Sequence, residues 1–448
     1  MQNGIRKKTK LTPMRILALG FAMVILTGTF LLMLPISSAN GKVTSFFDCL
    51  FIATSSTCVT GLVTLDTGTH WNYFGKTVIM ILIEVGGLGF MSFATLFALL
   101  LGKKITMQQR LVMQESLNSF KLQGLVKMAR YVLIFTFTVQ TVAAIILSTQ
   151  FIPQFGLGKG IYYSIFHSIS GFCNAGIDLF GNFSSVTSYH DNPVVIITLG
   201  SLIIIGGLGF YVWQEIYTNK GFRKLSLNTK VVLLVTAILI VGGTILMYLF
   251  EMNNPGTIKN MSLRGQILSS WFAAVTPRTA GFNSISTADM SPGGRFLTII
   301  LMFIGGSPGS TAGGIKTTTV GILFFTVVSV VKGREDTEIF KKRIPRDIVT
   351  RAIAITFIAI SLVTVVTMIL CITEKGTSLE YIIYETVSAF GTVGLTLGLT
   401  PHLSDIGKVV LAFTMYCGRV GPLTFAIALA KRSYLKGVKY PEDKIIVG

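Results

Sequence analysis

The sequence predicts an all-α integral membrane protein built from four repeats, and three observations lead to this fold class. Only 13% of the 448 residues are charged, and the mean hydropathy is +0.68, whereas soluble domains carry about 25% charged residues. Apolar runs recur from residue 14 to residue 430 without a polar block large enough to fold separately. The basic residues gather in a few segments between these runs. We therefore expect residues 1–448 to form a single multi-pass domain in the cell membrane.

The distribution of basic residues predicts which side of the membrane each segment faces. The net charge is +19, and most of the 38 Lys and Arg residues lie in five segments: 1–15, 102–130, 219–230, 332–351 and 431–448. Because basic residues concentrate in cytoplasmic loops, both termini are expected in the cytoplasm. The predicted cytoplasmic loops are 102–127, 219–229 and 332–349, and the predicted cytoplasmic tail is 431–448. Contact with membrane lipid headgroups is an alternative use of these charges. No nucleic acid partner is expected, because aromatic residues are not interleaved with the charges.

Each stretch between basic segments must leave the cytoplasm and return, which divides the chain into four units. The predicted repeats are about 14–101, 128–218, 229–331 and 350–430. The first run of each unit is long enough to cross the hydrocarbon core, at 14–34, 130–152, 230–250 and 351–372. The second is half as long and suits a re-entrant helix, at 43–56, 160–172, 263–276 and 379–390. The third is long again, at about 74–101, 193–217, 294–331 and 406–430.

A glycine motif follows each short run and gives the clearest evidence of the repeat. The four motifs read TCVTGL, FCNAGI, PRTAGF and FGTVGL, and they share Gly61, Gly176, Gly281 and Gly394. Repetition at this scale indicates four copies of one structural unit around a common axis. In the alternative interpretation, glycine only terminates each short helix as its C-cap. A cap, however, does not require the neighbouring small and Thr residues to recur.

Four such loops can form a selectivity filter for a monovalent cation. Irregular backbone at membrane depth must be buried in protein or line a polar pathway, and a ring of carbonyl oxygens can replace a cation's hydration shell. Glycine lets successive carbonyls point inward at positive φ, and the short helices direct their partly negative C-terminal ends to the same centre. The loops supply no carboxylate ring, which favours a monovalent cation over calcium or magnesium. The residues predicted to form this filter are Thr57, Cys58, Val59, Thr60, Gly61, Cys173, Asn174, Ala175, Gly176, Arg278, Thr279, Ala280, Gly281, Gly391, Thr392, Val393 and Gly394.

With these features the chain resembles the Trk/Ktr/HKT superfamily of potassium transporters over essentially its whole length. The resemblance implies eight transmembrane helices and four re-entrant pore helices around a pseudo-fourfold central pore. The first spanning run begins almost at the N-terminus, which resembles the membrane subunit (KtrB) of bacterial Ktr systems. Gly61 in the first filter position favours potassium, because the resemblance associates serine there with sodium-transporting relatives.

The resemblance also implies cofactors and partners. It implies potassium ions at the filter carbonyls, uptake that is often sodium-dependent, and a homodimer in which each protomer has its own pore. It further implies a cytosolic ring of nucleotide-binding, KtrA-like regulatory subunits. A nucleotide is therefore expected on that partner, and no organic cofactor is expected on this chain.

A second glycine cluster occurs in each inner helix, and the third cluster predicts a gate. The clusters are GGLGF at 86–90, GGLGF at 206–210, GGSPG at 305–309 and CGRVGP at 417–422. Close helix packing through small residues explains the first two. Residues 305–314 read GGSPGSTAGG, which does not favour a continuous helix, and an unwound loop there would obstruct the pathway below the filter. The residues assigned to the gate are Gly305, Gly306, Ser307, Pro308, Gly309, Ser310, Thr311, Ala312, Gly313, Gly314, Lys316 and Arg419.

Ionisable residues inside the apolar segments are expected to face a polar cavity or a partner. Arg419 is predicted to hold the gate loop through hydrogen bonds to carbonyls. The alternative is a structural ion pair between Arg419 and Glu84. Asp48, His167 and Glu385 are predicted to brace the short helices or to place charge in the outer vestibule.

Other functions fit the sequence less well. A sodium or mixed-cation pathway remains the alternative within ion transport. A secondary transporter of a small organic solute is expected to have inverted repeats, whereas these repeats run parallel. An enzyme is disfavoured because the four histidines are scattered and no HExxH or GxSxG motif occurs.

Overall fold

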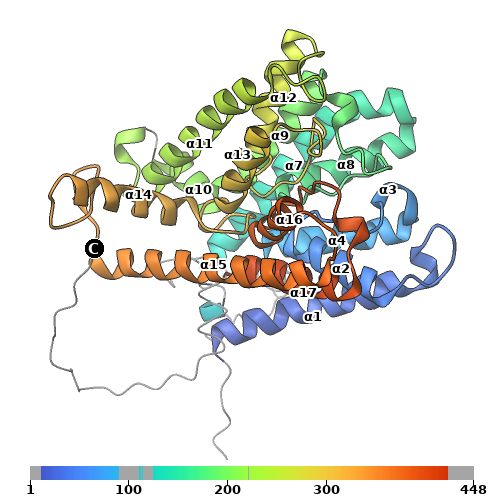
Figure 1. Cartoon of the computed structure of the whole chain (residues 1–448), viewed down its shortest axis with the longest axis horizontal. Helices are drawn as coiled ribbons and strands as arrows, with labels where there is room; N and C mark the ends of the chain where they lie inside the picture. The colour runs from blue at the N-terminus through green and yellow to red at the C-terminus, as the bar shows by residue number, and fades with distance from the viewer. Residues whose placement is uncertain (1–11, 90–109, 113, 115–124, 220, 422–448) are drawn as a thin grey trace, which may run out of the picture.

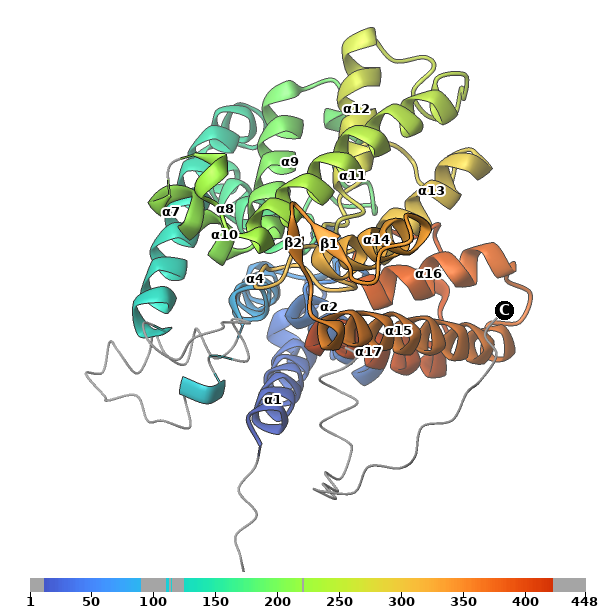
Figure 2. The same cartoon turned by 90° about the vertical axis from the view of Figure 1, so that its left-hand side faces the viewer.

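The computed structural model describes residues 12–89, 110–112, 114, 125–219 and 221–421. Helices make up most of this part of the chain, and its two strands, β1 (Glu338–Ile339) and β2 (Lys342–Arg343), form a small antiparallel hairpin. Figure 1 shows the long helices of the four repeats, and Figure 2 shows that successive repeats follow one another around the molecule, from α1 past α8 and α12 to α15.

Within the described residues, four unbroken helices are long and apolar enough to cross a membrane, and one opens each repeat. They are α1 (Pro13–Met33), α7 (Leu125–Phe155), α11 (Leu227–Glu251) and α15 (Arg346–Thr373). At most a third of the most apolar window of each helix is buried within the protein. Because so much apolar surface remains uncovered, these helices are suited to contact lipid. Their bounds lie within a few residues of the runs predicted from the sequence, so the all-α membrane class is confirmed.

A short helix follows each opening helix and is buried at its C-terminal end. These helices are α2 (Phe46–Cys58), α8 (Leu157–Cys173), α12 (Leu263–Val275) and α16 (Leu379–Gly391). Residues 51–58 of α2 are all buried, and the last four residues of the other three helices are buried as well. Helices of 13 to 17 residues are too short to cross the hydrocarbon core comfortably, so they carry the chain into the interior of the protein.

Within the described residues, the closing helices of the second and third repeats are each interrupted, and those of the first and fourth are described only up to residues 89 and 421. The closing helices are α4 (Tyr73–Leu88), α9 (Pro193–Leu208) with α10 (Phe210–Thr218), α13 (Pro292–Phe303) with α14 (Thr317–Val331), and α17 (Asp405–Val420). The run 193–217 predicted one long segment, but α9 and α10 meet at a bend of 90°. Gly209, between them, has φ 93°, a conformation that glycine adopts without steric cost. The second GGLGF cluster therefore breaks its helix, which close packing alone did not predict.

The N-terminal ends of the closing helices are built alike. The side chains of the four N-cap residues accept hydrogen bonds from backbone N–H groups of the first turn, and these residues are Asn72, Asn192, Ser291 and Ser404. In the fourth repeat the carboxylate of Glu374, a buried residue at the C-terminal end of α15, also accepts hydrogen bonds from the Ser404 N–H and hydroxyl. A Cβ on Gly407 would collide with this carboxylate. A larger residue here would displace the carboxylate from its bonds to Ser404.

Neighbouring repeats meet in a cyclic order. The closing helix of one repeat packs on the short helix of the next, as α4 on α8, α9 on α12, α13 on α16 and α17 on α2. Two of these boundaries carry an ion pair near the N-terminus of the closing helix, Arg295 with Glu380 at 3.2 Å and Lys408 with Asp48 at 2.9 Å. Short segments complete the links: α3 (Thr67–His70), η1 (Pro35–Ser37), η2 (Thr187–Tyr189), η3 (Phe222–Lys224) and η4 (Thr400–His402).

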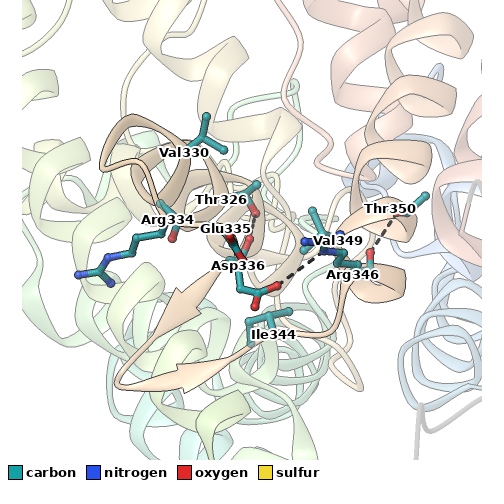
Figure 3. A pocket seen from close by; sticks show the side chains of 11 residues that line it. Thr326, Val330, Arg334, Glu335, Asp336, Ile344, Arg346, Val349 and Thr350 are labelled. Atoms are coloured by element: carbon teal, nitrogen blue, oxygen red, sulfur yellow. Dashed lines mark hydrogen bonds and ion pairs between the residues drawn. The ribbon is translucent and has the colours of Figure 1, made fainter. Parts of the chain in front are cut away.

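The predicted cytoplasmic loop 332–349 folds as a hairpin against the helices. Ile339 and Ile344 are buried with Val231 of α11. A pocket of about 230 Å³ lies between the hairpin and the ends of α14 and α15, and in Figure 3 Asp336 points across it toward Arg346. Most of the predicted loop 102–127 lies outside the described residues. The whole of the predicted tail 431–448 lies outside them as well.

Candidate functional site

The four glycine loops share one backbone conformation. The residue two positions before each glycine has positive φ, with 58° at Val59, 62° at Asn174, 71° at Thr279 and 51° at Thr392. The glycines have φ of 95°, 63°, 82° and 94° at Gly61, Gly176, Gly281 and Gly394. Non-glycine residues at positive φ are uncommon and cost energy, so their recurrence in all four repeats indicates a functional constraint. The caps of α2, α8 and α16 are the non-glycine residues, so the glycines are not merely caps.

The four loops meet in a closed ring. A Cβ placed on each glycine would collide with the carbonyl oxygen of the residue that precedes the glycine of the next repeat. The pairs are Gly61 with Ala175, Gly176 with Ala280, Gly281 with Val393, and Gly394 with Thr60. The fourth loop thus closes on the first, in the same cyclic order as the helices. We refer to these four loops as the glycine ring.

Each loop of the glycine ring is held by a hydroxyl group of its own short helix. Ser55 Oγ accepts from the Gly61 N–H at 3.0 Å, and Ser388 Oγ accepts from the Gly394 N–H at 3.1 Å. In the other two repeats the hydroxyls of Ser170 and Thr276 donate to carbonyls of the residues after the glycine. Sequence reasoning missed these residues. The signal that could have found them is a Ser or Thr five or six positions before each shared glycine.

The ionisable residues of the short helices brace the segments around the ring. His167 Nε2 accepts from the Leu179 N–H at 3.3 Å, just after the second loop. Glu385 accepts from the Thr396 hydroxyl at 2.7 Å, just after the fourth loop. Asp48 forms the ion pair with Lys408 already described. Burial lowers the pKa of His70, in α3, although the negative charge of Asp48 acts to raise it.

A ten-residue non-helical loop, 305–314, separates α13 from α14 and lies against the glycine ring, and its two ends meet where the Gly305 N–H donates to the Ile315 carbonyl at 2.9 Å. Its backbone bonds to the end of α9, because the Ser307 N–H donates to the Gly207 carbonyl at 2.9 Å. The Thr311 hydroxyl donates to the carbonyl of Phe172, in the last turn of α8, at 3.3 Å. A Cβ on Gly313 would collide with the side chain of Thr392. This segment, which we call the gate loop after its predicted role, therefore touches the last turn of α8, directly before the second loop of the ring, and the fourth loop itself.

Two partly buried basic residues hold the gate loop. Arg419 of α17 donates to the carbonyl of Thr311 and, from its other amino group, to the carbonyls of Gly86 and Gly87 in α4. Lys316 donates to the Ala312 carbonyl at 2.6 Å, within the loop itself. The alternative ion pair with Glu84 is not found: in the described structure the hydrogen-bond partners of that carboxylate are Gln140 and Cys173.

The predicted filter residues do not all lie on the ring. Thr57, Cys58, Cys173 and Gly391 belong to the last turns of the short helices. Arg278 is buried, with its side chain directed toward α11, where Nη2 donates to the Thr236 hydroxyl at 3.2 Å. The ring contacts come instead from the shared glycines and the residues directly before them. All of the predicted gate residues lie on the gate loop or in contact with it.

A ring of backbone carbonyls at the buried ends of short helices, in a membrane domain, is the arrangement of a cation transport protein rather than of an enzyme. Residues 10–435 match the TrkH family, described as cation transport protein. The chain therefore belongs to the TrkH family of multi-pass membrane cation transport proteins, and the resemblance seen in the sequence is confirmed.

Full-length relatives and a solved structure agree with this assignment. The chain is 45% identical to the potassium/sodium uptake protein NtpJ of Enterococcus hirae, over 100% of this chain and 99% of that protein. It is 41% identical to the Ktr system potassium uptake protein B of Bacillus subtilis, with the same coverage. The crystal structure of the potassium transporter TrkH from Vibrio parahaemolyticus aligns with a TM-score of 0.73, covering 96% of this chain and 87% of that one at 17% identity. That likeness supports the fold.

Proposed function

We propose that this protein takes up potassium across the cell membrane through a selectivity filter made by the glycine ring. The single observation that carries the proposal is the closed contact of the four glycines with the carbonyls of their neighbours. Side chains are excluded there, so backbone oxygens are left to replace the water shell of a monovalent cation. The two full-length relatives, a potassium/sodium uptake protein and a potassium uptake protein, support the same substrate class.

The proposed topology has eight membrane crossings and four re-entrant pore helices around a pseudo-fourfold pore. The opening helices supply four crossings, and the closing segments supply the other four. The gate loop obstructs the pathway on the cytoplasmic side of the ring, held by Arg419 and Lys316. Its position against the last turn of α8, directly before the second filter loop, and against the fourth filter loop supports this role.

The proposed assembly is a homodimer, in contact with membrane lipid, whose cytoplasmic face binds a ring of nucleotide-binding regulatory subunits. The relative named as protein B of a Ktr system supports such a ring. The folded hairpin at 332–349 places the exposed Lys341 and Lys342 at its tip, where a partner can reach them.

Flux through the purified protein in lipid vesicles tests the proposal. Rubidium and potassium uptake should be measured with sodium present and absent, because sodium dependence is part of the expected behaviour. We expect potassium and rubidium to enter in preference to sodium. Equal or preferred sodium flux would favour the second candidate, a sodium or mixed-cation pathway, which the name of the Enterococcus relative also supports.

A further inference from the structure

A buried carboxylate lies in α4, between the second filter loop and the carbonyls of α4 that Arg419 binds, which we call the gate anchor. Glu84 is 6% exposed, and its Oε2 accepts from Gln140 Nε2 at 2.8 Å and from the Cys173 thiol at 3.3 Å. Its Oε1 has no hydrogen-bond partner in the described structure. Ionisable groups at membrane depth are costly and are usually functional. The contacts of Glu84 therefore indicate what it does.

The first set of contacts leads to the second filter loop. Cys173 is the last residue of α8 and directly precedes Asn174, whose left-handed backbone begins the loop. The same thiol packs on α4, because a Cβ on Gly87 would lie 2.6 Å from Cys173 Sγ. Gln140 adds a second connection, since its carbonyl accepts from the Ser168 hydroxyl of α8 at 2.6 Å. Through Cys173 and Gln140, Glu84 thus holds the C-terminal end of α8 in place.

The second set of contacts leads to the gate. The carbonyls that Arg419 binds in α4 belong to Gly86 and Gly87, within one helical turn of Glu84. If Arg419 leaves these carbonyls when the gate loop moves, the end of α4 loses its partner on one side. The position of Glu84, and with it Cys173, then depends on the state of the gate.

The other three repeats lack this carboxylate. Glu84 lies twelve positions after its N-cap, and the corresponding residues of the other closing helices are Ile204, Phe303 and Tyr416. The acid thus occurs in the repeat whose closing helix accepts the two bonds from Arg419. A general need of the fold would place it in every repeat, so a local role between anchor and filter accounts for it better.

We propose that Glu84 is a positioning residue that couples the gate to the selectivity filter, through its hydrogen bond to Cys173 on one side and the Arg419 anchor on the other. The inference rests on the proposed function of the glycine ring and the gate loop. It assigns Glu84 no contact with the permeating ion.

Selectivity provides the first test. Glu84→Ala should lower the ratio of potassium to sodium flux several-fold, measured per folded protein in vesicles. Glu84→Gln keeps a side-chain oxygen for Cys173 and Gln140 and should restore most of the ratio. If coupling is real, the effect of Glu84→Ala measured in an Arg419→Ala background should differ from its effect alone by at least threefold. Additive effects, or an unchanged ratio in a folded Glu84→Ala protein, would overturn the proposal.

Accessibility of the Cys173 thiol provides a test that does not depend on selectivity. In a full chain whose other four cysteines are replaced, Cys173 is buried and should react slowly with a membrane-permeant maleimide. Glu84→Ala should raise the rate about tenfold, and Arg419→Ala should raise it several-fold with Glu84 in place. No change in the Arg419→Ala protein contradicts coupling. If the wild-type protein instead shows no preference for potassium, the proposed function fails, while the thiol rates still decide the role of Glu84.

Discussion

Replacing Arg419 with Ala tests the gate most directly, because three hydrogen bonds to two separate segments depend on this one guanidinium. Two of them fix α4 and one fixes the gate loop at Thr311. A hydrogen bond with a charged donor is worth about 1.5–3 kcal/mol. If the bond to Thr311 is made only with the loop in its closed position, its loss favours the open position by about 1.5 kcal/mol, and the open fraction rises roughly tenfold.

The assay is rubidium uptake into vesicles, normalised to folded protein. We expect Arg419→Ala to raise flux several-fold and to keep most of the preference for potassium over sodium, because in the described structure the hydrogen bonds of Arg419 go to the gate loop and α4 and not to the glycine ring itself. Deleting residues 308–311 should have the same effect on flux. Arg295→Ala is the matched control, since this arginine of α13 pairs with Glu380 away from the gate loop and should give no gain.

Two results would refute this reasoning. A deletion in the gate loop that lowers flux at normal expression would mean that the loop supports the pathway rather than blocks it. Loss of folded protein on Arg419→Ala, with no gain in flux for the molecules that remain, would assign the residue a structural role. Arg419→Lys should fall between wild type and Ala, because a single ammonium cannot reach both carbonyl groups as a planar guanidinium does.

Three further predictions concern the filter, the partner and the fold. Gly61→Ser should reduce the ratio of potassium to sodium flux in folded protein, because a side chain there meets the Ala175 carbonyl; an unchanged ratio would contradict the filter assignment. Neutralising Lys341 and Lys342 should weaken co-purification with a nucleotide-binding subunit but leave membrane insertion intact, and undiminished binding would exclude the hairpin tip from the interface. Gly407→Ala should lower the yield of folded protein, because overpacking costs about 1–3 kcal/mol, whereas Gly158→Ala, with nothing within 4 Å of its Cβ, should not.

The long and short helices could be predicted from the sequence because the bilayer sets their lengths. An apolar run that must cross about 30 Å needs roughly 20 residues, and α1, α11 and α15 match this closely. The shared glycines could be found because the repeat places the same residue at the same point four times. In each case one local rule acts strongly enough to appear in the sequence of a single chain.

Other features depend on contacts between residues far apart in the chain. An ion pair between Glu84 and Arg419 was open as the alternative in the sequence, but Glu84 accepts hydrogen bonds from Cys173 and Gln140, which come from another repeat. The 90° bend at Gly209 could not be distinguished from close packing, because a GGLGF motif fits both. The boundary between helix and loop was also ambiguous in the sequence: Thr57 and Cys58 belong to the glycine motif, yet they lie in the last turn of α2.

Among the described residues, a loop like 305–314, the proposed gate, occurs in one repeat of the four, which bears on how such a pathway can be built. The loop lies beside the ring and touches the last turn of α8 and the fourth loop of the ring at once. In an assembly of four identical chains, every chain would carry this insertion, and four copies would compete for a space that holds one. Joining the repeats in one polypeptide removes that conflict, because each quarter is encoded separately. One quarter can then act as the obstruction, another can supply its anchor, and the remaining two need only complete the ring.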